Sequence, residues 1–293
     1  MVAFMQRVLI ALAISSAAQA SAAAPVTAAV TSAGASEAPR PIIIGPSYRV
    51  PSAILGGSRV INVQLPEHYG DGGRRFPVLY LLDGGEHEDF EHIAGLAQIN
   101  AAYGQGQEMI VVGIEGVDRR HDLTSPSSVP GDLKSAPTSG GAEAYRRFLT
   151  EELRPWVQSR FRTNGRTALI GESLAGLFVL ETFLEQPETF SDYIAVSPSL
   201  WWNGGKVVSR ARQNLRRGSY AGKRLWIAFE TPPPPVDAAA KDRALQRALE
   251  QAFRSRKPNG LNWTIVHSPN GHASIYHPAA VQAFRTLYGT PTS

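Results

Sequence analysis

The stretch Gly171-Glu172-Ser173-Leu174-Ala175-Gly176 stands between the apolar run RTALIG at residues 166–171 and a helical pattern at residues 175–186. A strand, a tight turn around a serine with small neighbours, and a helix form the context of a nucleophile elbow. Such a turn leaves the serine hydroxyl exposed above a sheet, with backbone N–H groups of the helix beside it. The motif carries Ala175 where G-x-S-x-G has glycine. It predicts Ser173 as a nucleophile, and the alternative is a serine that only caps the helix.

Short apolar runs and longer helical patterns alternate on both sides of this motif. Strands are predicted at residues 47–55, 58–64, 76–82, 108–113, 166–171, 192–197, 223–229 and 262–267. Helical patterns fall at residues 88–102, 142–160, 175–186, 203–216, 237–255 and 278–288. The first two strands flank Gly56-Gly57 and are typical of a hairpin, whereas the later runs are continuously apolar, as in parallel sheets. The sequence therefore predicts an α/β fold, a mostly parallel central sheet with helices on both faces.

The composition fits one domain of this kind, which we expect over residues 41–293. The chain has 293 residues, 27 glycines, 21 prolines and no cysteine. The absence of cysteine excludes disulfides, thiolate metal sites and a cysteine nucleophile. The 29 Lys and Arg residues and 25 Asp and Glu residues form no run of like charge. This pattern favours an anionic small partner over nucleic acid.

The N-terminus has the order of a secretory signal peptide. Residues 1–20 hold Arg7, then an apolar run at residues 8–14, then small residues that end in Ala18-Gln19-Ala20. That run is shorter than the roughly 20 apolar residues of a membrane-spanning helix, and no later stretch approaches that length. Residues 21–40 are rich in Ala, Ser, Thr and Pro and predict a flexible leader. We expect a periplasmic or secreted bacterial protein without membrane insertion; the alternative is an apolar N-terminal helix.

The general base should follow the nucleophile in the chain, because α/β hydrolases order their triad as serine, acid, histidine. Four of the seven histidines precede Ser173. Of the others, His267 lies within the last predicted strand and His277 begins the final helix. His272 lies in a loop directly after the last strand, where an imidazole is free to reach the elbow. The sequence predicts His272 as the base.

Two carboxylates are candidates for the acid that orients this imidazole. Glu230 ends the strand at residues 223–229, and Asp237 follows a run of prolines. We favour Glu230, because Asp237 stands where a helix N-cap belongs. A Ser–His dyad without an acid stays open. For the oxyanion hole, the amide after the nucleophile is that of Leu174, and the loop after strand 76–82 offers Gly85 as the second donor.

Several weaker signals concern the substrate. Trp201 and Trp202 either form an apolar wall for an acyl or aryl group or pack into the protein. Residues 116–141 form a long irregular stretch that we expect to rim the site, and its Arg119 is a candidate to attract an anionic substrate. His87 and His92 are five residues apart, not the four of a zinc-binding H-E-x-x-H helix, so we predict no metal site.

Five motifs in order resemble the bacterial putative-esterase family of α/β hydrolases. They are YLLDGG at 80–85, EMIVVGIEGVDRRHDLTSP at 108–126, IGESLAG at 170–176, AVSPSLWWN at 195–203 and NGHASI at 270–275. This family includes periplasmic enterobactin and salmochelin esterases, esterase D-like enzymes and mycolyltransferases. The resemblance covers about residues 42–290. It implies a cofactor-independent serine hydrolase that uses Ser173, His272 and the amides of Gly85 and Leu174.

The sequence and the resemblance together predict a carboxylic ester hydrolase that acts on a small-molecule ester through an acyl-serine intermediate. The sharpest candidate substrate is a siderophore lactone of the enterobactin kind, and a short-acyl or carbohydrate ester is another. Two alternatives remain: acyl transfer by the same fold, and a binding protein that kept the fold without catalysis.

Overall fold

The computed structural model describes residues 41–231, 237–256 and 258–289, and of residues 237–239 the backbone alone. The predicted signal peptide and leader, residues 1–40, lie outside the described residues. The chain from Ile43 onward groups into one compact unit. Within the described ranges, no helix combines the length and the apolar character that crossing a bilayer requires.

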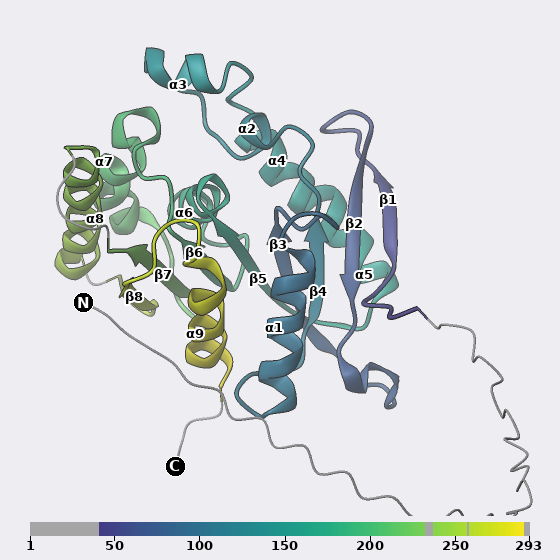
Figure 1. Ribbon diagram of the computed structural model, residues 1–293. Coiled ribbons are helices and arrows are strands. Elements are labelled where there is room, and N and C mark those ends of the chain that lie inside the picture. The colour runs from purple at the N-terminus through teal and green to yellow at the C-terminus, as the bar shows by residue number, and fades with distance from the viewer. Residues whose placement is uncertain (1–40, 232–236, 257, 290–293) are drawn as a thin grey trace, which may run out of the picture. The chain divides into compact units, whose positions relative to one another are not determined.

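An eight-stranded sheet forms the centre of this unit (Figure 1), with the order β1-β2-β4-β3-β5-β6-β7-β8. The strands are β1 (Ser47–Pro51), β2 (Ser58–Gln64), β3 (Phe76–Leu82), β4 (Ile110–Ile114), β5 (Thr163–Glu172), β6 (Asp192–Val196), β7 (Arg224–Glu230) and β8 (Asn262–Ser268). β1 and β2 form the predicted hairpin, and β2 is antiparallel to β4. All other pairs are parallel. The prediction of a mostly parallel sheet is therefore confirmed.

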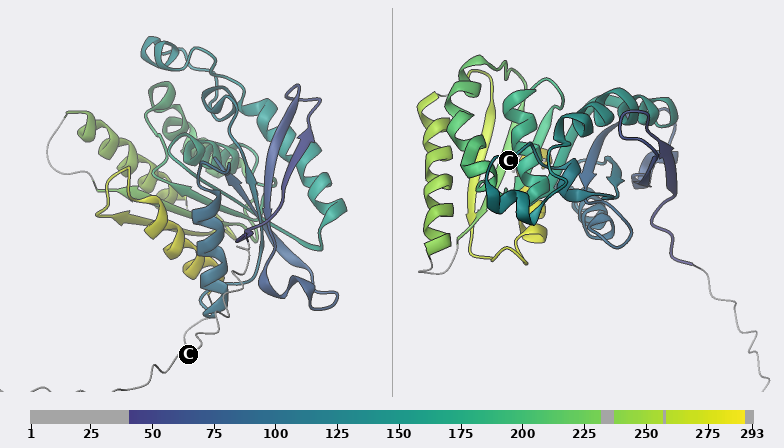
Figure 2. Two further views of the ribbon diagram at one scale, coloured as in Figure 1. Left: turned by 45° about the vertical axis from the view of Figure 1, so that its right-hand side comes forward. Right: turned by 90° about the horizontal axis from the view of Figure 1, so that it is seen from above.

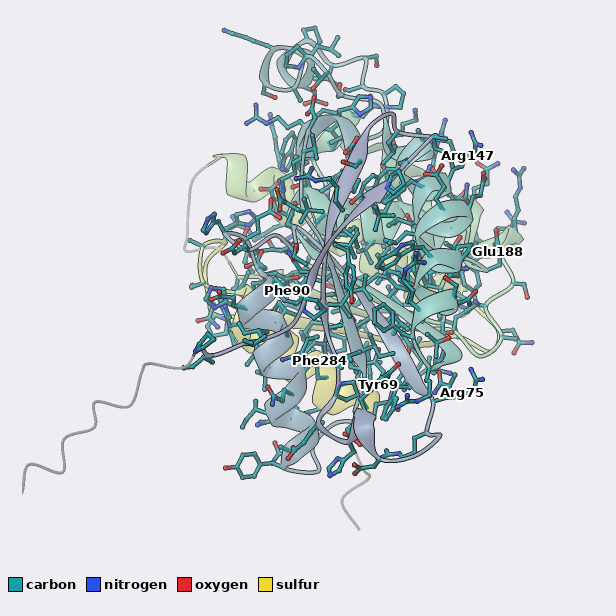
Figure 3. All side chains as sticks on the ribbon, turned by 90° about the vertical axis from the view of Figure 1, so that its right-hand side faces the viewer. Tyr69, Arg75, Phe90, Arg147, Glu188 and Phe284 are labelled. Carbon is teal, nitrogen blue, oxygen red and sulfur yellow. The ribbon has the colours of Figure 1, made fainter. Side chains whose placement is uncertain are left out.

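Helices cover both faces of the sheet (Figure 2). One face packs against α1 (Phe90–Ala102) and α9 (Tyr276–Tyr288). The other packs against α4 (Ala142–Arg147), the π-helical turn η2 (Phe148–Leu153), α5 (Arg154–Arg160), α6 (Leu174–Glu185), α7 (Trp202–Arg217) and α8 (Asp237–Arg256). Figure 3 shows Phe90 and Phe284 on one side of the sheet and Arg147 and Glu188 on the other.

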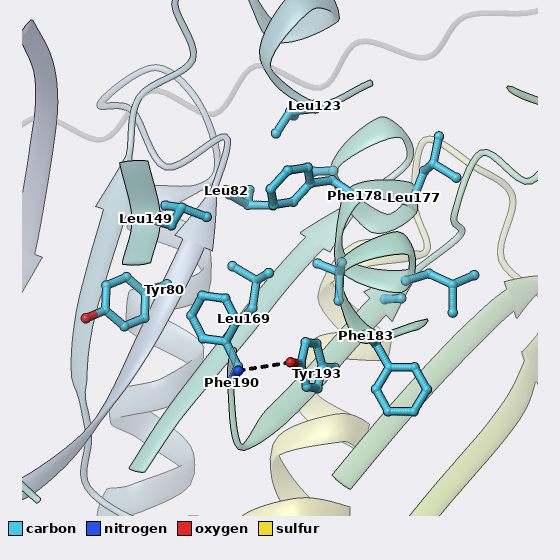
Figure 4. Packing of buried hydrophobic residues seen from close by; sticks show 14 of the residues in the cluster. Tyr80, Leu82, Leu123, Leu149, Leu169, Leu177, Phe178, Phe183, Phe190 and Tyr193 are labelled. Atoms are coloured by element: carbon cyan, nitrogen blue, oxygen red, sulfur yellow. Dashed lines mark hydrogen bonds between the residues drawn. The ribbon is translucent and has the colours of Figure 1, made fainter. Parts of the chain in front are cut away.

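Side-chain alternation along the strands explains why the apolar runs are continuous. Successive side chains of a strand point to opposite faces, so Tyr80 and Leu82 of β3 enter the core under α6, while Leu79 and Leu81 pack towards α1 and α9. Aromatic rings pack among leucine side chains in the first of these cores (Figure 4). There the Phe190 amide donates to the Tyr193 hydroxyl at 2.9 Å. A strand buried on both faces has no place for a polar alternation.

The first strand is shorter than predicted, since β1 ends at Pro51 and not at residue 55. The amides of Ala53 and Ile54 donate to the Glu152 carboxylate, at 2.9 and 3.1 Å. These amides are therefore unavailable to a strand ladder. Glu152 is about a hundred residues away in the chain, so local propensity could not reveal the break.

The stretch at residues 116–141, predicted as irregular, contains two short helices. These are α2 (Arg119–Asp122) and α3 (Pro130–Ser135). The Asp118 carboxylate caps α2 by accepting from the His121 amide at 3.0 Å. Pro130 occupies the first position of α3, where its fixed φ suits a helix and its missing N–H costs nothing. The 3-10 turn η1 (Glu67–Gly70) precedes β3.

Candidate active site

Ser173 forms the turn between β5 and α6, with φ 59° and ψ −118°. A positive φ is unfavourable for a residue with a Cβ and persists only where the surroundings impose it. Here the Ser173 amide donates to the Val196 carbonyl and the Ser199 amide donates to the Ser173 carbonyl, both at 3.0 Å. The segment around β6 thus holds the strained turn at the carboxyl edge of the sheet.

Small residues on either side of Ser173 let the strand and the helix approach each other. A Cβ on Gly171 would lie 2.6 Å from the Ala175 Cβ, and one on Gly176 would lie 2.6 Å from the Val196 carbonyl oxygen. Ala175 itself is completely buried. The methyl group of Ala175 fits into the elbow because Gly171, which faces it, has no side chain.

The loop after β8 brings His272 to this turn. Its Nε2 lies 3.1 Å from the Ser173 Oγ. Its Nδ1 lies 3.0 Å from the Ser197 Oγ and 3.7 Å from the Glu230 Oε1. Hydrogen-bond distances on both ring nitrogens suit an imidazole that accepts the serine proton on Nε2 and donates from Nδ1.

Two side chains therefore face the Nδ1 of His272. Glu230 ends β7, and its Oε1 lies within ion-pair distance of Nδ1, although 3.7 Å is too long for a hydrogen bond. Asp237, the other predicted acid, is the first residue of α8, and its side chain is not described. Ser197, whose hydroxyl lies at hydrogen-bond distance from Nδ1, was not predicted from the sequence. The available signal was its place directly after β6, since functional residues gather beyond the carboxyl ends of parallel strands.

The two predicted oxyanion donors differ in their surroundings. Leu174 is the first residue of α6, where amides have no acceptor within the helix. The Gly85 amide, by contrast, donates to the Glu88 Oε2 at 2.7 Å, and the Gly116 amide donates to the same oxygen at 3.2 Å. The amide predicted as the second oxyanion donor therefore has a side-chain acceptor in this structure. A glutamate three residues further on reaches back to the amide, as in a capping box.

Arg119 connects the loop after β3 to the elbow. Its Nε donates to the Asp83 Oδ2 at 2.8 Å, and its Nη2 donates to the Glu172 carbonyl at 3.2 Å. Arg119 was predicted as a substrate ligand, yet these two nitrogens bind the protein itself. Its neighbour Arg120 donates to the Ser135 carbonyl. Within the structure, Arg119 joins two loops of the site and does not line the cavity described below.

Two carboxyl groups beside the elbow have raised pKa values. Burial raises the pKa of Asp83 to about 6, against the opposing charge of Arg119. Burial, together with the nearby Asp89 carboxylate, raises the pKa of Glu172 to about 7, again opposed by Arg119. One oxygen of each, Asp83 Oδ1 and Glu172 Oε1, is buried without a hydrogen-bond partner. Such groups lose their charge close to neutral pH.

A cavity of about 240 Å³ opens beside Ser173 and His272. Its wall includes Trp201, whose side chain is 45% exposed. Trp202 is only 2% exposed, and its indole N–H donates to the Ser125 carbonyl at 2.9 Å. Of the two alternatives left open for these tryptophans, Trp201 lies in the wall of the cavity and Trp202 packs into the protein. The other lining residues are Ser173, Ser197, Pro198, Ser199, Leu200, Phe229, Glu230, Asp242, Gln246 and His272.

Metal-ligating side chains do not gather in the part of the chain that the structure describes. There, no group of three or more His, Asp and Glu residues could hold a metal ion. His92 instead packs edge to face against His277, with ring centroids 4.8 Å apart.

Residues 52–260 match the family described as "Putative esterase". The siderophore triacetylfusarinine C esterase of Aspergillus fumigatus is 32% identical over 199 residues, which are 61% of this chain and 66% of that protein. The ferri-bacillibactin esterase BesA of Bacillus subtilis is 33% identical over 151 residues, 46% of this chain and 52% of that protein. The chain thus spans only about half to two thirds of the length of these two curated relatives.

A solved structure gives the more complete match. The crystal structure of an IroE-like serine hydrolase from Shewanella oneidensis has a TM-score of 0.76 and 28% sequence identity, covering 83% of this chain and 80% of that one. The shared architecture and the sheet described above are those of an α/β hydrolase. Since the family match extends over most of the chain, this protein belongs to the putative-esterase family.

Proposed function

We propose that this protein is a serine esterase that cleaves carboxylic esters through an acyl intermediate on Ser173. The observation that carries the proposal is the 3.1 Å distance between the Ser173 Oγ and the His272 Nε2 at a strained turn. A hydroxyl hydrogen-bonded to a base, which other side chains orient in turn, is the arrangement of acyl-transfer enzymes. Membership in an esterase family supports the same chemistry.

The reaction has two halves. The Ser173 Oγ attacks the ester carbonyl carbon while the His272 Nε2 takes the hydroxyl proton. The tetrahedral intermediate collapses, the bond to the alcohol oxygen breaks, and His272 returns the proton to the leaving alcohol. Water then attacks the acyl-serine with His272 again as the base, and the carboxylic acid leaves as Ser173 regains its proton. Water is the only second reactant.

Ser197 and Glu230 orient His272 in this scheme. Donation from Nδ1 to the Ser197 Oγ, over 3.0 Å, leaves the Nε2 lone pair free to accept the serine proton. The imidazolium that forms is then stabilised by the Glu230 carboxylate 3.7 Å away. Ser197 therefore orients the imidazole through a hydrogen bond, and Glu230 stabilises the imidazolium through its charge.

The Leu174 amide donates to the oxyanion in the same scheme, helped by the positive end of the α6 dipole. The Gly85 amide is the second donor. Because it now holds the Glu88 carboxylate at 2.7 Å, the substrate oxyanion has to displace that carboxylate. The Glu88 Oε2 thus occupies the position on the Gly85 amide that the oxyanion of the tetrahedral intermediate would take.

We propose a siderophore ester as the substrate. The names of two relatives support it, a triacetylfusarinine C esterase and a ferri-bacillibactin esterase. Both names describe hydrolysis of an ester in a small iron-binding molecule.

Hydrolysis of p-nitrophenyl butyrate and of a cyclic siderophore triester tests both parts of this proposal. Ser173→Ala is expected to lower kcat by about a thousandfold or more. Ser209→Ala, on the exposed side of α7, serves as the matched serine control and is expected to keep full activity. Retention of activity by a folded Ser173→Ala variant would contradict the mechanism. Hydrolysis of the butyrate but not of the siderophore would contradict only the substrate.

We also propose that residues 1–20 direct export to the periplasm or beyond. Their fusion to a reporter enzyme that is active only after export tests this. The expected result is reporter activity that disappears when Leu9 and Leu12 in the apolar run are both changed to Arg, because charges abolish the apolar segment. Equal activity of the two fusions would contradict it.

A further inference from the structure

Besides the elbow and the loop that carries His272, three segments from distant parts of the chain line the cavity beside Ser173. The segment after β6 contributes Trp201, the end of β7 contributes Glu230, and α8 contributes Asp242 and Gln246. Ser173 and His272 form its catalytic side. Any part of an ester that is held here lies between the reacting groups and α8.

The charged side chains of this cavity are acidic. Asp242 and Glu230 line it together with His272, and no lysine or arginine is among the described lining residues. Asp242 is half-buried. Burial raises its pKa while the charge of His272 lowers it, so the two side chains lie within electrostatic reach of each other. A chain with a formal net charge of +4 thus has a locally acidic binding site.

Arg119 and Arg120, the adjacent arginines of the stretch at residues 116–141, do not neutralise the charge of these carboxylates. Arg119 donates hydrogen bonds to the Asp83 carboxylate and to the Glu172 carbonyl, and Arg120 donates to the Ser135 carbonyl. An anionic group in the cavity would meet two carboxylates and no lysine or arginine among the described lining residues. Like charges placed together without compensation are strongly unfavourable, and proteins use them to reject wrong partners.

The remaining lining groups suit an uncharged guest. Gln246 is only 9% exposed, and its side-chain amide can both donate and accept hydrogen bonds. Trp201 offers an aromatic face, and Asp242 accepts hydrogen bonds from hydroxyl or amide groups. These chemistries fit an uncharged group that carries hydrogen-bond donors next to an apolar or aromatic surface.

We infer that this cavity binds an uncharged, hydrogen-bond-donating part of the ester and that Asp242 excludes anionic esters from it. The inference rests on the proposed esterase function and narrows its substrate class. Asp242 is here a specificity-determining residue, with no part in the transfer of the serine proton.

Three p-nitrophenyl esters of similar length test the inference: the hexanoate, the half ester of adipic acid and the 5-(trimethylammonio)pentanoate. They are neutral, anionic and cationic. The kcat/KM for the anionic ester is expected to be about tenfold or more below that for the hexanoate, from the Coulomb energy of like charges at a partly hydrated site. Asp242→Asn should narrow this ratio to about threefold or less, and should lower kcat/KM for the cationic ester. A parallel set with the charge on the alcohol covers the case in which the alcohol occupies the cavity.

Asp71→Asn is the matched control, because Asp71 is exposed and lies just after η1, away from the cavity. It is expected to leave the ratio unchanged. In the wild type, raising the salt concentration from 0.05 to 0.5 M should narrow the ratio without any substitution, since salt screens charge. Equal kcat/KM for all three esters in both sets, or a ratio that Asp242→Asn leaves unchanged, would overturn the inference. Failure to cleave even the neutral esters would overturn the esterase function, and the inference with it.

Discussion

Ser197 has a backbone φ of 41° and places its hydroxyl 3.0 Å from the His272 Nδ1. Ser197→Ala removes that hydrogen bond and leaves Glu230 alone to orient the imidazole. We expect kcat for p-nitrophenyl butyrate to fall about tenfold with little change in KM, because orientation of a base acts on the chemical step. Steady-state kinetics beside Ser209→Ala measures this. An unchanged kcat, or an effect confined to KM, would show that Ser197 has no such role.

Glu172 adjoins the nucleophile, and burial raises the pKa of its carboxyl to about 7. The group is neutral below that pH and negative above it, and a negative charge beside Ser173 disfavours the developing oxyanion. We therefore expect Glu172→Gln to increase kcat/KM severalfold at pH 8 and to leave it unchanged at pH 5.5. A pH–rate profile of both proteins measures the difference. Superimposable profiles would contradict this role of the charge.

The same shift has a consequence for stability. Since the folded pKa of Glu172 lies above its ordinary value of 4.5, the folded state binds the proton more tightly than the unfolded state. The contribution of Glu172 to the free energy of unfolding is therefore fully present below about pH 4.5 and is lost as the pH rises towards 7. Glu172→Gln should raise the urea midpoint at pH 8 and not at pH 4.5. The opposite ordering would mean that the carboxylate stabilises the fold.

At the scale of elements, Arg119 of α2 ties the loop after β3 to the end of β5. Arg119→Ala would leave the buried Asp83 carboxyl without its charged hydrogen-bond donor, at a cost of about 2 kcal/mol of unfolding free energy. The substitution should also lower kcat, because the loop that carries Gly85 loses the hydrogen bonds through which Arg119 connects it to the end of β5. Adding Asp83→Asn removes the uncompensated charge and should restore part of the stability.

Urea unfolding of the single and double variants measures this coupling. Arg147→Ala is the control, because the Arg147–Glu151 pair lies on the exposed surface and such pairs contribute little. Additive losses in the double variant would indicate that Arg119 and Asp83 do not act as a pair.

The local sequence pattern predicted which segments are strands and which are helices. It did not predict where β1 ends or which acceptor binds the Gly85 amide. Periodicity separated strands from helices because burial on both faces of β3 leaves an unbroken apolar run. The end of β1 depended instead on Glu152, and the occupation of the Gly85 amide depended on the rotamer of Glu88. The first is a distant tertiary contact and the second a side-chain choice, and neither has a periodic signature.

At the scale of the whole molecule, the order of motifs identified Ser173, His272 and Glu230 as neighbours, because parallel strands bring their carboxyl ends to one edge. Which further side chains line the cavity depends on the packing of the folded chain. Trp201 and Trp202 are adjacent in sequence, yet one lines the cavity and the other lies in the core. Asp242 reaches the cavity from α8, which only the packing of that helix determines.

The core of the described chain begins at Val50, its first buried hydrophobic residue. A protein that starts at residue 41 is therefore expected to retain the full kcat and the thermal midpoint of the longer chain. Comparison of the two purified forms measures this. A clear loss of stability on removal of residues 1–40 would mean that the catalytic domain extends into them.

A fluorophosphonate probe tests the activation of Ser173 by His272 directly, without a choice of substrate. We predict that the probe labels the peptide containing Ser173, as mapped by mass spectrometry, and that His272→Ala abolishes the labelling. A folded protein that stays unlabelled, or that is labelled at another serine, would contradict the account.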